Sequence, residues 1–128
     1  MSARILIAED DPQNMYLARF LLQKAGYDVL SARDGQEAVD VAIANRPDLV
    51  LMDMLLPRMD GFEATRRIKA CDDLEVTVVA LTAYSMKGDK EAILRAGCDG
   101  YISKPIDPEL FVGQVEHYLI PDSQEETQ

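Results

Sequence analysis

The sequence predicts an α/β fold in which helices cover both faces of a parallel sheet. Two observations lead to this prediction. Short apolar runs alternate with helical patterns five times along the chain, and the first, third and fourth runs are almost continuously apolar. Strict alternation indicates a parallel sheet, and unbroken apolar runs are typical of strands covered on both faces. The chain has 128 residues, 48% of them hydrophobic, which is enough for one domain with its own core.

The expected elements follow from apolar spacing and from helix caps. An Asp precedes the helical pattern in four places, and its carboxylate can accept the first free N–H groups of a helix. These caps are Asp11, Asp34, Asp60 and Asp107. We expect strands at about 5–8, 27–32, 48–53, 76–81 and 100–103, each followed by a helix, at about 12–25, 34–46, 60–70, 85–96 and 107–119.

The five units are expected to form one doubly wound, three-layer (βα)5 domain. The second and fifth apolar runs are shorter or more polar than the others, so they belong at the edges of the sheet. This favours the strand order 2-1-3-4-5, which is the flavodoxin-like arrangement. We expect the domain to span residues 1–120, with a short acidic tail at 121–128. Leu110, Phe111, Val115, Tyr118 and Leu119 should form the apolar stripe of the last helix.

Composition excludes several classes of protein. The 23 acidic and 13 basic residues give a net charge of −10, which argues against nucleic-acid binding by the general surface. No apolar run approaches the ~20 residues of a membrane helix, and Met1–Arg4 has no signal-peptide layout. Cys71 and Cys98 match no metal spacing and no disulfide framework. A cytoplasmic protein with reduced thiols is therefore expected.

Polar residues close four of the expected strands. Glu9 and Asp10 follow the first strand, Asp53 closes the third, Thr82 follows the fourth, and Lys104 follows the fifth. The carboxyl ends of parallel strands share one edge of the sheet, and ligands bind there at the point where the strand order reverses. Any one of these residues alone would more often be a cap or a solvated side chain. Their common position at four strand ends favours a site.

The residue types indicate the chemistry of this site. Three carboxylates repel one another and raise each other's pKa, and a divalent cation would relieve that repulsion. Oxygen ligands without His or Cys favour Mg²⁺. A metal site alone has no need of Thr82 or Lys104, whereas a phosphoryl group would use both a hydroxyl donor and an ammonium. The set suits transfer of a phosphoryl group to a carboxylate, which forms an aspartyl phosphate.

The ordered motifs resemble those of a response-regulator receiver domain over about residues 4–119. Residues 86–89 and 96–101 are similar to those of stand-alone, single-domain receivers of cell-cycle phosphorelays, and also to those of receivers in hybrid kinases. The four matching motifs are Ile7–Asp11, Asp53–Gly61, Leu81–Ala83 and Tyr101–Pro105.

The resemblance implies a phosphoacceptor and a metal site. Asp53 would accept a phosphoryl group from a phosphohistidine of a histidine kinase or a histidine phosphotransfer protein. Asp10 and Asp53 would bind Mg²⁺ together with the backbone carbonyl of Leu55, and Glu9 would act through water. The protein would then be a regulatory phosphoacceptor rather than an enzyme, although it promotes its own phosphoryl transfer and slow hydrolysis.

The resemblance also implies a switch. Thr82 and the backbone N–H of Ala83 would hold phosphoryl oxygens, Lys104 would pair with another, and the Lys104–Pro105 bond would be cis. Movement of Thr82 toward the phosphate would let Tyr101 turn inward. This would remodel the face formed by the fourth helix, the fifth strand and the fifth helix, through which a monomer or weak dimer would contact a downstream protein.

Three alternatives stay open at this point. The chain could be a phosphoryl shuttle or sink in a phosphorelay. A flavodoxin-like electron carrier shares the strand order, although it would need a hydroxyl- and Gly-rich loop after the first strand. A phosphatase that forms an aspartyl phosphate would need an acidic residue two positions after the nucleophile, where this chain has Leu55. Since neither Leu55 nor Tyr84 can readily orient an attacking water, a long phosphoryl lifetime is expected.

Overall fold

Five parallel strands form one sheet in the order β2-β1-β3-β4-β5, as the sequence predicts. The structure is a computed structural model and describes residues 3–83 and 87–119. The expected tail at 121–128, Tyr84, and the first two residues of the helix expected at 85–96 lie outside this description. The strands are β1 (Arg4–Ala8), β2 (Asp28–Ala32), β3 (Leu49–Asp53), β4 (Thr77–Thr82) and β5 (Gly100–Ser103).

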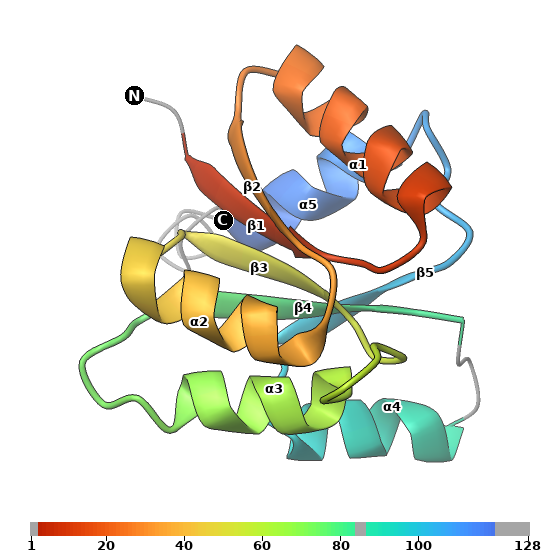
Figure 1. Ribbon diagram of the computed structural model, residues 1–128. Helices are drawn as coiled ribbons and strands as arrows, with labels where there is room; N and C mark the ends of the chain where they lie inside the picture. The colour runs from red at the N-terminus through yellow and green to blue at the C-terminus, as the bar shows by residue number, and fades with distance from the viewer. Residues whose placement is uncertain (1–2, 84–86, 120–128) are drawn as a thin grey trace, which may run out of the picture.

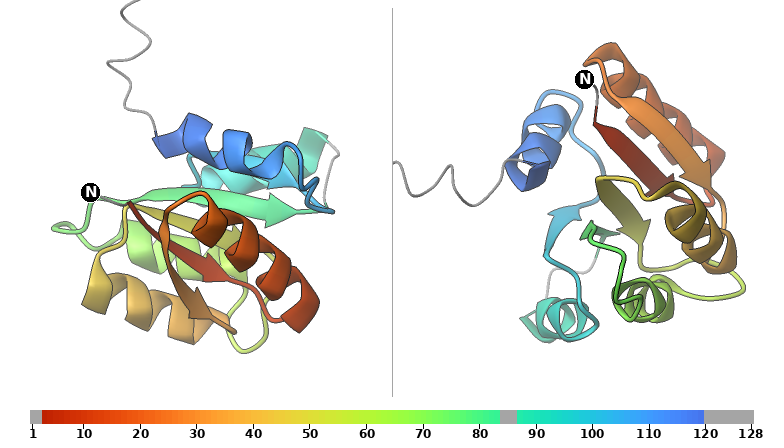
Figure 2. Two further views of the ribbon diagram at one scale, coloured as in Figure 1. Left: turned by 90° about the horizontal axis from the view of Figure 1, so that it is seen from above. Right: turned by 90° about the vertical axis from the view of Figure 1, so that its left-hand side faces the viewer.

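Helices cover both faces of the sheet and give the fold three layers. Figure 1 and Figure 2 show α1 and α5 on one face, and α2, α3 and α4 on the other. Within the described residues, no helix is both long enough and apolar enough to cross a membrane. The helices are α1 (Pro12–Lys24), α2 (Gly35–Asn45), α3 (Gly61–Lys69), α4 (Lys87–Arg95) and α5 (Phe111–Leu119).

Two apolar cores flank the sheet because successive residues of a strand point to opposite faces. In β1, Ile5 and Ile7 pack with the buried residues of α1 and α5. Leu6 and Ala8 instead join the core under α2 and α3. All five residues of β3 are buried, which confirms that this run is covered on both faces. The central strand therefore carries Asp53 from the interior directly to the edge of the sheet.

Three of the predicted caps form as expected. Asp11, Asp34 and Asp60 each accept a hydrogen bond from a backbone N–H of the helix that follows. Glu37 and Glu63 lie three positions after the caps Asp34 and Asp60, but their carboxylates do not accept a hydrogen bond from the backbone N–H of the cap residue. Glu37 accepts from the N–H of Arg33, one residue further back, and Glu63 pairs with arginines of its own helix.

The start of α5 differs from the prediction. Asp107 caps a turn, with its carboxylate accepting from the N–H of Glu109 at 2.9 Å, and α5 begins only at Phe111. Leu110 lies in that turn, outside the helical repeat, and its side chain is 56% exposed. The assignment of Leu110 to the apolar stripe was therefore wrong, whereas Phe111 and Val115 are buried as expected.

The start of α3 is packed tightly beneath the end of β3. The N–H of Gly61 donates to the carbonyl oxygen of Met54 at 3.0 Å. A Cβ atom at Gly61 would overlap the backbone carbonyl oxygen of Asp53 and lie 2.7 Å from the Cα atom of Met54. These neighbours are backbone atoms and cannot move aside as a flexible side chain would, so this position requires glycine.

We expect Gly61→Ala to lower the free energy of unfolding by about 1–3 kcal/mol, the usual cost of overpacking. Gly113→Ala is the matched control, because no atom lies within 4 Å of a Cβ there and the residue is inside α5. The control should raise stability by up to about 1 kcal/mol, since alanine is the better helix former. Urea unfolding of both variants measures this; equal effects of the two substitutions would contradict it.

Candidate functional site

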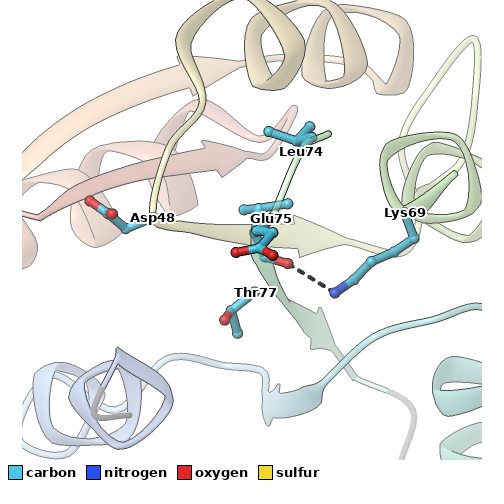
Figure 3. A pocket seen from close by; sticks show the side chains of 6 residues that line it. Asp48, Lys69, Leu74, Glu75 and Thr77 are labelled. Carbon is cyan, nitrogen blue, oxygen red and sulfur yellow. Dashed lines mark hydrogen bonds between the residues drawn. The ribbon is translucent and has the colours of Figure 1, made fainter. Parts of the chain in front are cut away.

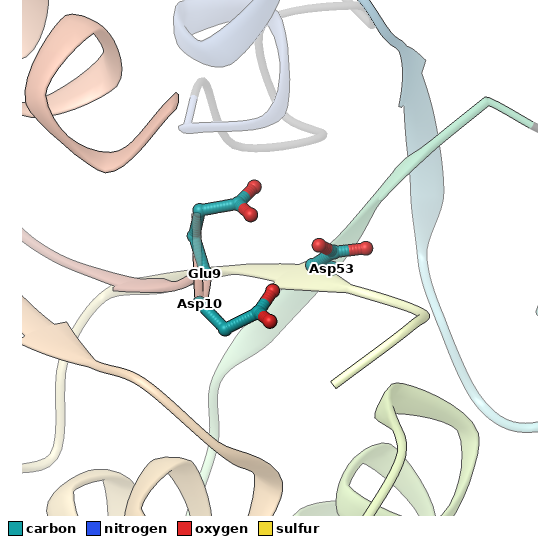
Figure 4. Close-up of side chains that lie close together, drawn as sticks. All are labelled: Glu9, Asp10 and Asp53. Carbon is teal, nitrogen blue, oxygen red and sulfur yellow. The ribbon is translucent and has the colours of Figure 1, made fainter. Parts of the chain in front are cut away.

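Glu9, Asp10 and Asp53 lie together where β1 and β3 end (Figure 4). Each offers a carboxylate oxygen, and these oxygens lie within 4.8 Å of one another. Glu9 and Asp53 are buried, whereas Asp10 is exposed. The convergence that the sequence predicts is therefore confirmed for all three carboxylates.

Lys104, which directly follows β5, joins this group at the same end of the strands. Its Nζ atom lies 3.1 Å from Oε1 of Glu9 and 3.2 Å from Oδ2 of Asp53, with the side chain 18% exposed. The N–H of Lys104 also donates to the carbonyl oxygen of Thr82 at 2.8 Å, which joins the ends of β4 and β5. The Lys104–Pro105 bond is cis. One ammonium thus bridges the two buried carboxylates.

Backbone N–H groups fix the other oxygen of each buried carboxylate. The N–H of Leu55 donates to Oδ1 of Asp53 at 3.0 Å. The N–H of Asp11 donates to Oε2 of Glu9 at 3.1 Å. Each buried carboxylate therefore has one oxygen on Lys104 and one on the loop after its own strand. This holds both groups in defined orientations, as preorganised sites require.

Burial raises the pKa of Glu9 above its usual value, and the nearby charge of Asp53 adds to the rise. The N–H of Asp11 and the ammonium of Lys104 act in the opposite direction but do not outweigh these effects. For Lys104, burial alone would lower the pKa. The hydrogen bond to Glu9 and the charge of Asp53 reverse this, so the pKa is raised. Three carboxylates and one lysine make up this group, so its ionised form has more negative than positive charge.

The remaining predicted residues lie at the ends of β3 and β4 and on β5. Thr82 is the buried last residue of β4, and Ala83 follows it on the surface. The side chain of Leu55 is 62% exposed. Tyr101 is half-buried on β5, and the Nζ atom of Lys90 in α4 lies 5.3 Å from the centre of its ring.

Two arginines beside the site were missed by the sequence analysis. Arg19 of α1 and Arg33 line a cavity of about 230 Å³ whose wall also includes Glu9, Asp10 and Ser31. Arg33 directly follows β2, just as Glu9 directly follows β1 and Lys104 directly follows β5. The signal in the sequence was the residue after the second strand, which was not considered with the residues that close the other four.

A larger cavity, of about 470 Å³, lies at the opposite end of the strands. Asp48 precedes β3 and Thr77 begins β4, so this cavity faces the amino edge of the sheet (Figure 3). Its lysine is already engaged, because Nζ of Lys69 donates to the carbonyl oxygen of Val76 at 2.9 Å and to Asp99 at 2.8 Å. The cavity therefore lies apart from the three carboxylates and Lys104, which lie at the carboxyl ends of the strands.

The fold and the carboxylate site define a doubly wound α/β domain with an acidic, lysine-bearing site at the switch point of its sheet. The response regulator receiver domain family matches residues 5–116, and the chain belongs to this family. It is a receiver domain of two-component signalling. This membership decides against the flavodoxin-like electron carrier that shares the strand order.

Relatives and solved structures agree with this assignment. The polar-differentiation response regulator DivK of Brucella anthropi is 44% identical over 120 residues, which cover 93% of this chain and 98% of that protein. The receiver domain of the sensor histidine kinase PA1611 from Pseudomonas aeruginosa is 36% identical, with a TM-score of 0.84 and coverage of 93% and 98%. That structure holds a magnesium ion in its active site cleft.

A chemotaxis regulator has the same architecture. CheY4 of Vibrio cholerae is 26% identical to this chain, with a TM-score of 0.88 over 94% of this chain and all of that one. Receiver domains bind Mg²⁺ and interact with histidine kinases and other proteins, and both properties fit a carboxylate site at the carboxyl ends of the strands, where Asp10 is exposed.

The raised pKa of Glu9 predicts that Glu9→Gln increases the free energy of unfolding by an amount that depends on pH. Because the native pKa lies above the unfolded value of 4.5, the native state keeps this proton longer than the unfolded chain and loses stability as pH rises through that interval. Without metal, the stability of the variant relative to the parent should therefore increase as the pH rises from about 4 to about 7. Urea unfolding in EDTA measures this difference.

Glu91→Gln is the matched control, because it removes one carboxylate from the exposed side of α4. It should show a smaller change between the two pH values than Glu9→Gln. An advantage of Glu9→Gln that is equal at both pH values, or larger in acid, would contradict the raised pKa of Glu9.

Proposed function

We propose that the carboxylate of Asp53 accepts a phosphoryl group from a phosphohistidine of a histidine kinase or a histidine phosphotransfer protein. The observation that carries this proposal is the bridge from Lys104 to both Glu9 and Asp53 beside a third carboxylate. A cation site alone would not need a lysine at its centre. A site that receives phosphoryl oxygens uses that ammonium once the group arrives.

The carboxylate site fits Mg²⁺. Its donors are all oxygen atoms, and three carboxylates lie there beside one lysine. Asp10, Asp53 and the backbone carbonyl of Leu55 would hold the ion, with Glu9 acting through water. When bound, Mg²⁺ neutralises charge on the carboxylates and on the phosphoryl oxygens.

The transfer step forms one bond and breaks one. A carboxylate oxygen of Asp53 attacks phosphorus, the P–N bond of the phosphohistidine breaks, and its electron pair stays on the imidazole nitrogen. Lys104 then exchanges its contact with Asp53 for a phosphoryl oxygen. The hydroxyl of Thr82 and the N–H of Ala83 donate to the other oxygens. These groups stabilise charge on the phosphoryl group during transfer.

The signal leaves through the face formed by α4, β5 and α5. Tyr101 lies on this face, where a cavity of about 210 Å³ is lined also by Gln114, His117 and Tyr118. Thr82 and Tyr101 act as the switch, which changes the face offered to a downstream protein. The domain acts in the cytoplasm as a monomer or weak dimer.

Phosphorylation tests the proposal directly. Incubation with phosphoramidate and Mg²⁺ should add one phosphoryl group to the chain, and Asp53→Asn should abolish the addition. EDTA should abolish it as well, because the carboxylates then repel the incoming group. Intact-protein mass spectrometry gives the readout.

A phosphotransfer profile with autophosphorylated histidine kinases of the host then identifies the protein donor. Asp60→Asn is the matched control for Asp53→Asn, because Asp60 caps α3 and lies outside the carboxylate group. Phosphorylation that persists in Asp53→Asn, or that proceeds equally in EDTA, would refute the proposal.

The phosphoryl lifetime should depend on Leu55. Its side chain is exposed at the site and cannot orient an attacking water. Leu55→Asn should therefore accelerate loss of the phosphoryl group roughly 5- to 10-fold, which is less than the ~10²–10⁴-fold of a full general base. The decay of the phosphorylated protein after removal of phosphoramidate measures the rate, and Leu55→Met serves as the apolar control. Equal decay of both variants would contradict the expectation.

A further inference from the structure

The cavity lined by Arg19 and Arg33 adjoins the phosphoacceptor site but takes no part in the proposed transfer. It has a volume of about 230 Å³ and borders Glu9 and Asp10 on the β2 side of the site. Lys104 approaches the same carboxylates from the opposite side, at the end of β5. The cavity therefore opens where a phosphoryl donor would come over the edge of the sheet.

Neither guanidinium has a partner within the part of the chain that the structure describes. Arg46, Arg58 and Arg66 each pair with a carboxylate, whereas no ion pair or hydrogen bond of the described residues involves the guanidinium of Arg19 or Arg33. The backbone N–H of Arg33 donates to Glu37. The chain has 23 acidic residues against 13 basic ones. In so acidic a protein, two unpaired guanidinium groups in one cavity form a local site for an anion.

The size and chemistry of the cavity indicate the occupant. Pockets for cofactors and drug-sized ligands measure about 300–1,000 Å³, so this one suits a single side chain. Guanidinium groups match the planar geometry of a carboxylate. A free phosphate ion would meet Glu9 and Asp10 with no other contacts to offset their repulsion, whereas a carboxylate on a docked protein is held by the rest of the interface.

We propose that Arg19 and Arg33 bind a carboxylate side chain of the phosphoryl donor protein, on the surface around its phosphohistidine. This inference rests on the proposed function. The two arginines are recognition residues, and the phosphoryl group itself does not touch them. Charged residues at the rim of an interface act mainly on the association rate and on its salt dependence. Loss of the contact should therefore change both the rate and its dependence on salt.

The test compares two donors on the Arg19→Gln/Arg33→Gln double variant. The protein donor is the autophosphorylated kinase that transfers fastest to the parent chain in the phosphotransfer profile. Its kcat/KM should fall about 10-fold at low salt, within the range that electrostatic steering supplies, and the loss should shrink as salt is added. Phosphorylation by phosphoramidate should stay within about 2-fold of the parent, because a small donor does not reach the cavity.

Arg66→Gln/Arg67→Gln is the matched control, since it removes the same charge from the exposed side of α3. It should leave kcat/KM with the protein donor within about 2-fold of the parent. Arg19→Lys/Arg33→Lys should recover part of the rate, because lysine restores the charge without the planar donors.

The outcomes separate the two proposals. A fall in kcat/KM confined to the protein donor and to the Arg19/Arg33 variant supports the contact. An unchanged rate, a fall equal to that of the α3 control, or an equal fall with phosphoramidate overturns it. If neither donor phosphorylates the parent chain at Asp53, the proposed function fails, and this inference fails with it.

Discussion

The arrangement of the site depends on two buried carboxylates that share one ammonium. Burying charge is costly, and an ion pair repays that cost only when its remaining polar atoms are also bonded. Glu9 and Asp53 meet this condition, because each also accepts a backbone N–H. With Asp10, three carboxylates face one lysine, so the formal charge is −3 + 1 = −2 when all are ionised. That residual charge equals the charge of one divalent cation with opposite sign.

Only the complete fold brings these groups together. Lys104 is 95 residues from Glu9 and 51 from Asp53 along the chain. Each crossover through a helix returns the chain to the start of the next parallel strand, so all strands end at the same edge. The glycine at position 61 lets α3 begin directly beneath Asp53. The site is therefore a property of the sheet and its crossovers rather than of any one loop.

Sequence patterns predicted the strand order from the polarity of the apolar runs, and the carboxylate cluster from the residues at which those runs stop. They failed where local spacing and tertiary packing disagree. Leu110 fits a helical repeat, yet the turn capped by Asp107 places it before α5. The contact between Lys90 and the ring of Tyr101 depends on how α4 lies against β5, which the pattern of neither segment contains. The boundary expected at residue 120 stays a prediction.

The carboxyl edge of the sheet has an ordered pattern of charge. In the strand order of the sheet, the residues that end or directly follow each strand are Arg33 at β2, acidic groups at β1 and β3, a hydroxyl at β4, and Lys104 at β5. The centre of the edge thus suits a cation, and both outer strands suit anions. Because the two basic flanks lie on opposite sides of Asp53, the proposed function gives Lys104 to the phosphoryl group, and the proposed contact gives Arg33 to the donor protein. Chemistry and recognition can then vary independently on one scaffold.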